Sequence, residues 1–267
     1  MSIRTPTERL RAIQRVVGVE PDGLLGPATL TALERALGLA PEPIVAKAEA
    51  ARTGLRLSRE GVDAIIRHEI GSDYYYNRHL RAPIWPGGDS GVTIGIGYDL
   101  GYQSEADFRA HWGDELPDGS LARLAAVCGK TGESARREIP KLRDISISLT
   151  RARRVFMKTS LPLYARKTHS AYPGIAELHP DAQSALVSLV YNRGTSMRNT
   201  DSRREMRELR DHVRTRDYGA MERALRSMKR LWAGRNLDGL LKRRDEEADM
   251  IARAASGAVD DGEVVMV

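Results

Sequence analysis

One glutamate stands on what should be the buried face of a helix. In "SREGVDAIIRHEIG", Ser58 can cap a helix whose apolar residues Val62, Ile65 and Ile66 repeat at the spacing of a single face. Continued by one turn, that stripe reaches Glu69. A carboxyl group there is costly unless desolvation keeps it protonated, as a general acid requires, or an arginine pairs with it. The pattern leaves both interpretations open.

A glycine-rich stretch, "GGDSGVTIGIGYDLG", follows at residues 87 to 101. Its branched and small residues alternate from Val92 to Ile96, which predicts a short strand after a turn. Such a hairpin would lie opposite Glu69. Because glycine permits close approach of a backbone to a ligand, the stretch is expected to line a binding cleft.

Two familiar motifs fail at a required residue. His68-Glu69 begins like the HExxH helix of zinc proteases, but the second histidine is replaced by Ser72. The glycines near residue 97 approach a dinucleotide-binding loop, but its last glycine is replaced by Leu100. A single cysteine, Cys128, excludes an internal disulfide. We therefore expect no metal site and no cofactor.

The first 42 residues form a separate unit, which is followed by the proline-marked joint "LAPEPIVAKA". The run "AIQRVVGVEPDGLLGPATLTAL" resembles the helical peptidoglycan-binding module of wall hydrolases, and an alternative boundary extends the module to residue 53. This resemblance implies wall binding near Asp22 and Gly23.

The rest of the chain, residues 55 to 255, reads as mostly helical. Glu69 followed by "TIGIGYDLG", with "HPDAQSALVSLVYNRG" and "WAGRNLDGLLKRRDEEADMI" further on, resembles the phage-type lysozymes and, more closely, the muramidase domain of pesticin. The resemblance implies a mainly α, α+β lysozyme-like fold: a helical catalytic domain with a small β-hairpin lining the cleft, beside the small N-terminal helical bundle.

The same resemblance assigns roles to three residues. Glu69 matches the general acid that protonates the glycosidic oxygen, Thr93 matches the threonine that orients water, and Asp99 matches the aspartate of the pesticin branch. Asp89 is the alternative, because in phage lysozymes the aspartate precedes the threonine. The implied reaction is inverting hydrolysis of the β-1,4 bond between N-acetylmuramic acid and N-acetylglucosamine in peptidoglycan, which uses two carboxyl groups.

Four further residues are candidates for contact with the substrate. Tyr98 and Tyr102 could stack on sugar rings, although core packing is the alternative for one of them. Asn192 and Arg193 end a helix just before Gly194 and could face the cleft. For Asn192, a helix cap and a sugar contact are equally compatible with the sequence.

Charge and composition restrict the expected binding partners and the expected cellular location. The formal net charge is +6, with an arginine-rich C-terminal third, which favours anionic wall or outer-membrane components. Few aromatic residues interleave with these arginines, so nucleic acid is not expected as a partner. We expect a monomer with no transmembrane segment and a C-terminal tail from 256 to 267. The N-terminal stretch does not look like a secretory signal, so we expect synthesis in the cytoplasm and release to the periplasmic wall through a holin or a secretion system.

Other classes of function remain compatible with this sequence. A lytic transglycosylase acts on the same polymer with one glutamate and no activated water, and a wall-binding protein could carry a decayed catalytic domain. A nucleic-acid binder would rest on the arginines alone. Thr93 with a paired aspartate favours the hydrolase.

Overall fold

The structure is a computed structural model that describes residues 6–16, 53–257 and 264–267. The chain divides into two units, Met1–Lys47 and Ala48–Val267. In the first unit, helix α1 spans Pro6–Val16, where a small helical bundle was expected. The rest of the expected helical bundle, with Asp22 and Gly23, lies outside the described residues.

The second unit is mainly helical, as predicted, and it has two small antiparallel sheets, of which the β2–β3 hairpin was expected and the β1–β4 sheet was not. Its helices are α4 (Arg59–Ile70), α5 (Asp73–Tyr75), α6 (Glu105–Trp112), α7 (Asp118–Ala125), α8 (Gly132–Arg136), α9 (Ile139–Leu142), α10 (Leu149–Lys158), α11 (Ser160–Ala171), α12 (Pro180–Arg193), α13 (Arg204–Thr215), α14 (Tyr218–Ser227) and α15 (Asp238–Ala254). Its strands are β1 (Arg56–Ser58), β2 (Thr93–Ile94), β3 (Tyr98–Asp99) and β4 (Val264–Met266).

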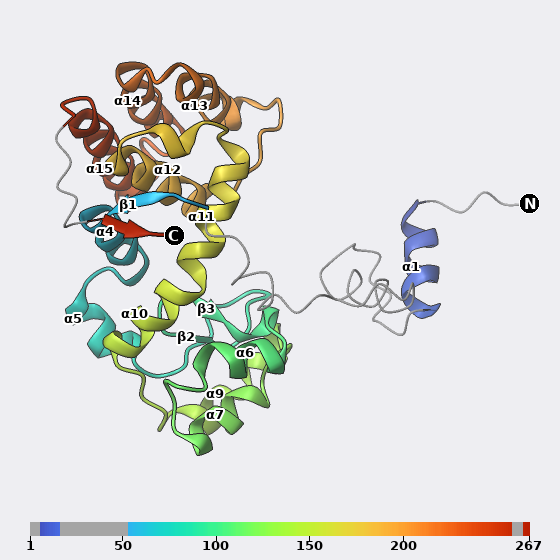
Figure 1. Ribbon diagram of the computed structural model, residues 1–267. Coiled ribbons are helices and arrows are strands. Elements are labelled where there is room, and N and C mark those ends of the chain that lie inside the picture. Colours follow the sequence, from blue (N-terminus) through green and yellow to red (C-terminus); the bar gives the residue numbers. More distant parts are fainter. Residues whose placement is uncertain (1–5, 17–52, 258–263) are drawn as a thin grey trace, which may run out of the picture. The chain divides into compact units, whose positions relative to one another are not determined.

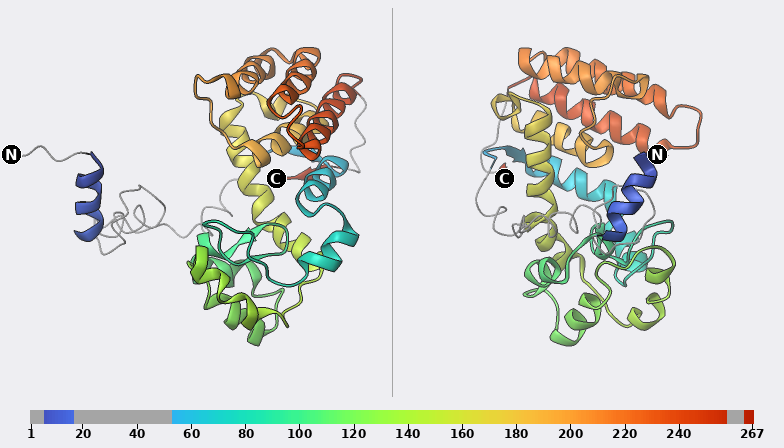
Figure 2. Two further views of the ribbon diagram at one scale, coloured as in Figure 1. Left: turned by 180° about the vertical axis from the view of Figure 1, so that it is seen from behind. Right: turned by 90° about the vertical axis from the view of Figure 1, so that its right-hand side faces the viewer.

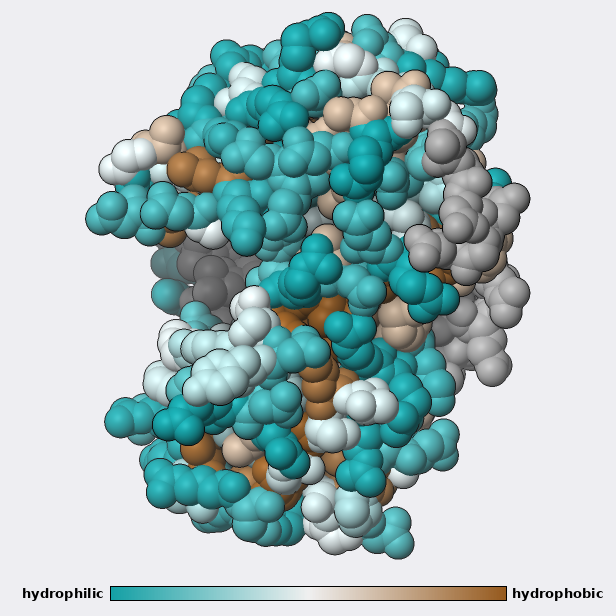
Figure 3. All heavy atoms as spheres, turned by 90° about the vertical axis from the view of Figure 1, so that its left-hand side faces the viewer, coloured by the Kyte–Doolittle hydropathy of each residue, from teal (hydrophilic) through white to brown (hydrophobic). Residues whose placement is uncertain are grey.

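The helices of this unit form two groups (Figure 1). Helices α12 to α15 lie together at one end, and the β2–β3 hairpin lies with α6, α7 and α9 at the other. Helices α10 and α11 run between the two groups, as the other views also show (Figure 2). The surface of the unit is hollowed between its two halves on one side (Figure 3).

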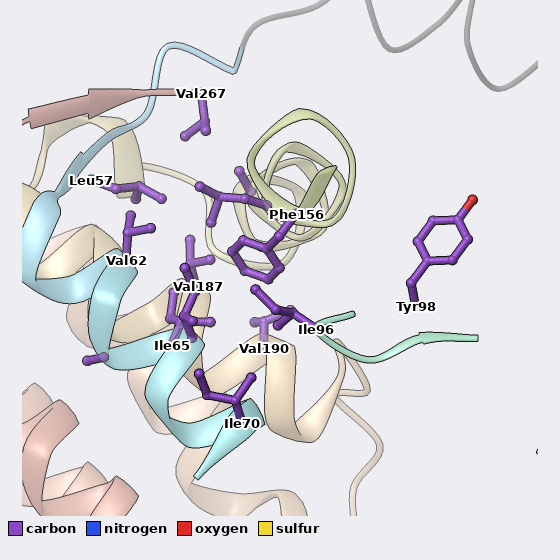
Figure 4. Packing of buried hydrophobic residues seen from close by; sticks show 14 of the residues in the cluster. Leu57, Val62, Ile65, Ile70, Ile96, Tyr98, Phe156, Val187, Val190 and Val267 are labelled. Carbon is purple, nitrogen blue, oxygen red and sulfur yellow. The ribbon is translucent and has the colours of Figure 1, made fainter. Parts of the chain in front are cut away.

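Helix α4 is fixed by its packing against α12. The Ser58 hydroxyl caps α4 by accepting a hydrogen bond from the Gly61 amide at 3.2 Å, as predicted. A Cβ atom at Gly61 would collide with the Ser184 side chain, so glycine allows α4 to lie directly against α12. Ile65 of α4 faces Val187 of α12 in the core between them (Figure 4). The C-terminal end of α4 is therefore held in place by the apolar stripe read from the sequence.

The C-terminal tail is part of the second unit, contrary to the boundary expected at residue 255. Strand β4 pairs antiparallel with β1, in the register Arg56 opposite Met266. The amide of Val267 then donates to the Leu55 carbonyl at 3.0 Å, and the Val267 side chain is buried. An exposed edge of β1 would leave backbone groups unpaired, and the tail satisfies them.

The glycine-rich stretch forms a hairpin that is shorter than expected. Strand β2 ends after Ile94, because Gly95 and Gly97 have φ angles of +59° and +68° and turn the chain. Between them, Ile96 points into the same core as Phe156 of α10 (Figure 4). The hairpin tip is thereby anchored in the apolar interior.

Within the described ranges, no helix is both long and apolar enough to cross a bilayer.

Candidate functional site

Glu69 lies near the C-terminal end of α4 and is paired with an arginine from α15. The Arg243 Nη1 atom donates to Glu69 Oε1 at 2.8 Å. The Glu69 side chain is 23% exposed, whereas that of Arg243 is 4% exposed. Of the two interpretations that the helical pattern left open, the structure therefore shows the ion pair. The carboxylate keeps some access to solvent, so it is available to a ligand.

A buried charged cluster holds Arg243 from behind. Its Nε and Nη2 atoms donate to the hydroxyl and the carbonyl of Ser188 on α12, at 3.2 and 3.0 Å. The Ser188 hydroxyl and Arg244 Nη2 each donate to Glu247 Oε1 at 2.6 Å, and Glu247 is fully buried. Arg243 Nε is 3.4 Å from the same oxygen. The cluster fixes the guanidinium, and the guanidinium in turn orients Glu69.

His68 lies beside this cluster and is neutral at neutral pH. Burial, reinforced by the charge of Arg243, lowers the pKa of the His68 imidazole to about 4. Its Nε2 atom is 3.0 Å from a carboxylate oxygen of Glu246. Since the imidazole is uncharged above this pKa, this approach is not an ion pair at neutral pH.

Glu69 opens into a pocket of about 600 Å³. The walls come from the end of α4, from Asn192 at the end of α12, and from the segment 236–246 that begins α15. Asn192 is exposed and lines this pocket, as its expected role in contacting a sugar requires. The lining side chains are mostly polar and carry both charge signs, and Leu237 and Leu240 are the apolar ones, which suits a polar ligand with some apolar surface.

The hairpin places Thr93 directly opposite Asp99 in antiparallel register. Residues paired in this way project to the same face of a sheet. The Thr93 hydroxyl is buried, and the described part of the chain offers it no hydrogen-bond partner. Because an unpaired buried hydroxyl costs about 1–3 kcal/mol, this position favours a water molecule or a ligand oxygen.

The Asp99 carboxylate binds backbone amides of the glycine-rich stretch. Its carboxylate accepts hydrogen bonds from the Gly91 amide at 3.0 and 3.1 Å and from the Gly101 amide at 2.8 Å. Gly91 and Gly101 touch so closely that a Cβ atom at Gly91 would collide with the Gly101 backbone. These glycines therefore allow the chain to approach itself, where a close approach to substrate was expected from the sequence.

The second acid and the two tyrosines differ sharply in exposure. Asp89 is exposed in a turn, and its carbonyl accepts a hydrogen bond from the Tyr102 hydroxyl at 3.0 Å. Tyr102 itself is 56% exposed and remains available as a stacking surface. Tyr98 is buried against Phe108 and Trp112, which is the core-packing alternative. A buried ring cannot stack on a sugar.

Tyr191 lies near both the hairpin and Glu69, although neither Thr93 nor Asp99 lines the Glu69 pocket. A Cβ atom at Gly97 would lie 3.9 Å from the Tyr191 hydroxyl. Burial raises the pKa of Tyr191, and the negative charge of Glu69 raises it further. The hairpin tip and the candidate acid are thus both neighbours of one aromatic side chain.

Arg193 lies outside the Glu69 pocket. Its guanidinium stacks 4.9 Å from the Trp232 ring centroid and donates to the Ser202 carbonyl. Burial lowers the pKa of Arg193 to about 10, at which the side chain is still charged at neutral pH. Arg193 therefore holds the loop after α12, and a sugar contact is not required to explain it.

Sequence reasoning did not single out Arg243, Glu247, Ser188 or Tyr191. The signal for the first two was present in "KRRDEE", because Arg243 and Glu247 are four residues apart on one helix face. Nothing local indicates that this pair meets Glu69, which is far away in the sequence. Ser188 reads as an ordinary small residue of a buried helix.

The comparison with known proteins gives a family without an assigned activity. No curated protein sequence matches the chain. Residues 66–234 match the family described as "Domain of unknown function (DUF8812)". This match includes the end of α4, the hairpin and α12, and it ends before α15 supplies Arg243. Because the match covers more than half of the chain, the protein belongs to the DUF8812 family.

Proposed function

We propose that this protein is a peptidoglycan hydrolase with a lysozyme-like catalytic unit. The observation that carries the proposal is the partly exposed Glu69 carboxylate, held by Arg243 at 2.8 Å at the wall of a pocket lined mostly by polar side chains. Hydrolysis of a glycosidic bond needs such a positioned carboxyl group as proton donor. Arg243 shares its charge between Glu69 and the buried Glu247, so it is not a counter-ion for Glu69 alone.

In this proposal, the substrate completes the environment of the acid. A sugar chain that covers the pocket would remove the remaining water from Glu69, and desolvation favours the protonated form of a carboxyl group. The unpartnered Thr93 hydroxyl then offers a position for the attacking water, and Asp99 or Asp89 is the second carboxylate. The bond cleaved is the β-1,4 link between N-acetylmuramic acid and N-acetylglucosamine.

Replacement of Glu69 by glutamine tests the proposal. Full-length protein should clear a suspension of purified peptidoglycan, and Glu69→Gln should lower the rate by about 10²–10⁴-fold with the fold retained. Glu60→Gln is the matched control, because Glu60 lies on the same helix, is exposed and forms a loose 3.4 Å pair with Arg253. A Glu69→Gln protein that clears walls at the wild-type rate would refute the role of Glu69.

The two aspartates can be separated by their environments. The Asp89 side chain is exposed in a turn, so Asp89→Asn should leave the fold intact. Asp99→Asn weakens three hydrogen bonds from backbone amides, so its melting temperature has to be measured beside its activity. Loss of activity in Asp89→Asn alone would make Asp89 the residue that handles water.

A lytic transglycosylase is a second candidate, favoured by one observation. The Asp99 carboxylate is occupied by backbone amides and does not line the pocket of Glu69, so Glu69 could act without a paired aspartate. Such an enzyme leaves a 1,6-anhydro sugar, and its products are lighter by one water. Mass spectrometry of the released fragments separates the two reactions.

The other elements of the proposal concern targeting. Residues 1–42 would bind the wall and keep the catalytic unit close to its substrate, which raises the local concentration of sugar chains. The protein would work as a monomer, after release from the cytoplasm to the periplasmic wall. Cosedimentation of a fragment spanning residues 1–47 with purified walls tests this targeting, and the absence of cosedimentation would contradict it.

A further inference from the structure

A second pocket, of about 480 Å³, lies apart from Glu69 between α11, the loop after α12, and α13. Three cationic side chains line it: Arg166 and Lys167 from α11 and Arg210 from α13. Its lining contains no acidic residue. The pocket therefore concentrates positive charge from two separate helices in one place.

Unlike several other arginines of the second unit, these cations have no carboxylate partner among the described residues. Arg204, Arg226 and Arg230 each contact at least one carboxylate in this half of the chain. Among the described residues, Arg166 and Arg210 have no ion-pair partner, and Lys167 lies over the Tyr164 ring with its Nζ 4.8 Å from the centroid. Unpaired cations that face one pocket are disposed to bind an anion.

The wall opposite α11 is held in position before any ligand arrives. Arg207 donates to the carbonyls of Arg198 and Thr200, and Arg203 Nη1 donates to the Arg193 carbonyl at 2.7 Å. Met197 of the same loop packs against the core. A pocket whose loop is already ordered loses little conformational entropy when a ligand binds.

The remaining lining groups narrow the class of ligand. Ser170 and Thr195 offer hydroxyl groups, while Leu163, Ala171 and Met197 offer apolar surface. Guanidinium and ammonium groups recognise carboxylates, hydroxyls bond to amides, and apolar walls accept methyl groups. A short peptide with several carboxylates and small apolar side chains matches all three.

We infer that this pocket binds the acidic stem peptide attached to the peptidoglycan sugar chain, an assignment that rests on the proposed function. A row of side chains links it with the candidate acid: Lys167 lies over Tyr164, whose ring centroid is 4.2 Å from that of Tyr191. Glu69 adds to burial in raising the pKa of both tyrosines, which puts its charge near them. In this inference, a peptide that branches from a sugar near Glu69 extends along these tyrosines toward the pocket.

Binding of the free peptide to the full-length protein tests the inference without any cleavage. The probe is a synthetic stem tripeptide of alanine, glutamate and diaminopimelate, titrated by calorimetry at low salt. Arg166→Gln and Arg210→Gln should each weaken binding about tenfold, and Arg166→Lys should retain most of it. Arg223→Gln is the control, since Arg223 is an exposed arginine of α14 outside the pocket, and it should leave binding unchanged.

Three results would overturn the assignment: no binding of the tripeptide to the wild-type protein, equal binding by Arg166→Gln and Arg210→Gln, or equal affinity for inorganic phosphate and for the tripeptide. A tripeptide with amidated carboxyl groups should bind at least tenfold more weakly, and undiminished binding would also contradict the inference. Wall clearing is measured separately. Peptide binding without wall cleavage would refute the hydrolase alone, and wall cleavage without peptide binding would refute this pocket alone.

Discussion

Replacing Glu247 by glutamine removes the negative charge at the centre of the buried cluster behind Glu69. The wild-type carboxylate is fully buried between Arg244 at 2.6 Å and Arg243 at 3.4 Å. In the variant, Arg243 keeps Glu69 and Ser188 as partners. Arg244 keeps the Met228 sulfur at 3.7 Å and the Trp232 ring at 5.8 Å, neither of which balances its charge. The loss of folding stability therefore comes mainly from the buried Arg244, which is left without a counter-ion.

The magnitude follows from the burial of both partners. Breaking a buried ion pair by removing one partner costs about 3–5 kcal/mol, and we expect about 3 kcal/mol because the glutamine oxygen still accepts a hydrogen bond. That is a large part of a typical folding free energy of about 5–15 kcal/mol. Urea unfolding at pH 7, followed by circular dichroism, measures the loss. Glu222→Gln, which breaks a surface pair with Arg226, should cost less than about 1 kcal/mol.

A double-mutant cycle separates the pair from the rest of the cluster. Arg244→Met and Glu247→Leu each leave one buried charge with fewer partners, while the double variant removes both charges. We expect the double variant to be more stable than the sum of the single losses predicts, by at least about 2 kcal/mol. Additivity within about 0.5 kcal/mol, or a loss below about 1 kcal/mol in Glu247→Gln, would refute the reasoning.

Two more predictions concern the hairpin and the pH response. Gly91→Ala should lower the free energy of unfolding in urea by about 1–3 kcal/mol, because its Cβ atom would meet the Gly101 backbone. Gly119→Ala is the control: Gly119 has open space around it, so this variant should be neutral or slightly stabilised. Equal stability of the two variants would contradict the close approach of Gly91 to Gly101. The pKa of His68 is about 4 in the folded chain, and its ordinary value is 6.5. Between these two pH values the unfolded chain binds a proton that the folded chain does not. The free energy of unfolding therefore falls as the pH drops below 6.5. Relative to His68→Gln, the wild type should lose about 2 kcal/mol between pH 7 and pH 5, and parallel pH curves for the two proteins would contradict the buried neutral imidazole.

The helical pattern around Glu69 was readable because it is local. The cap at Ser58 and the apolar stripe through Ile65 depend on residues within three or four positions of one another, and the structure has both. What surrounds the carboxylate was not readable, because Arg243 arrives from α15 by tertiary packing. The sequence therefore left two interpretations of Glu69 open, and a residue from another helix decided between them.

For the hairpin, the sequence predicted the local shape but not the contacts that its residues make. The glycines and alternating residues predicted a turn and a short strand, and both exist. The expected approach to a substrate stays a prediction, and the structure adds that Gly91 and Gly101 accommodate each other and that Asp99 binds their amides. A glycine in the sequence indicates that another group can approach closely but not which group, and at Gly91 that group is the Gly101 backbone.

By itself, the sequence determined a mainly helical unit, the position of Glu69 at the end of a helix, and a glycine hairpin with Thr93 and Asp99. Tertiary structure alone decided that Glu69 pairs with Arg243, that Tyr98 is core, and that the C-terminal strand closes onto β1. The physical reason is one of range. Periodicity, caps and turns act over a few residues, whereas the partner of a charge and the burial of a ring depend on which distant elements pack together.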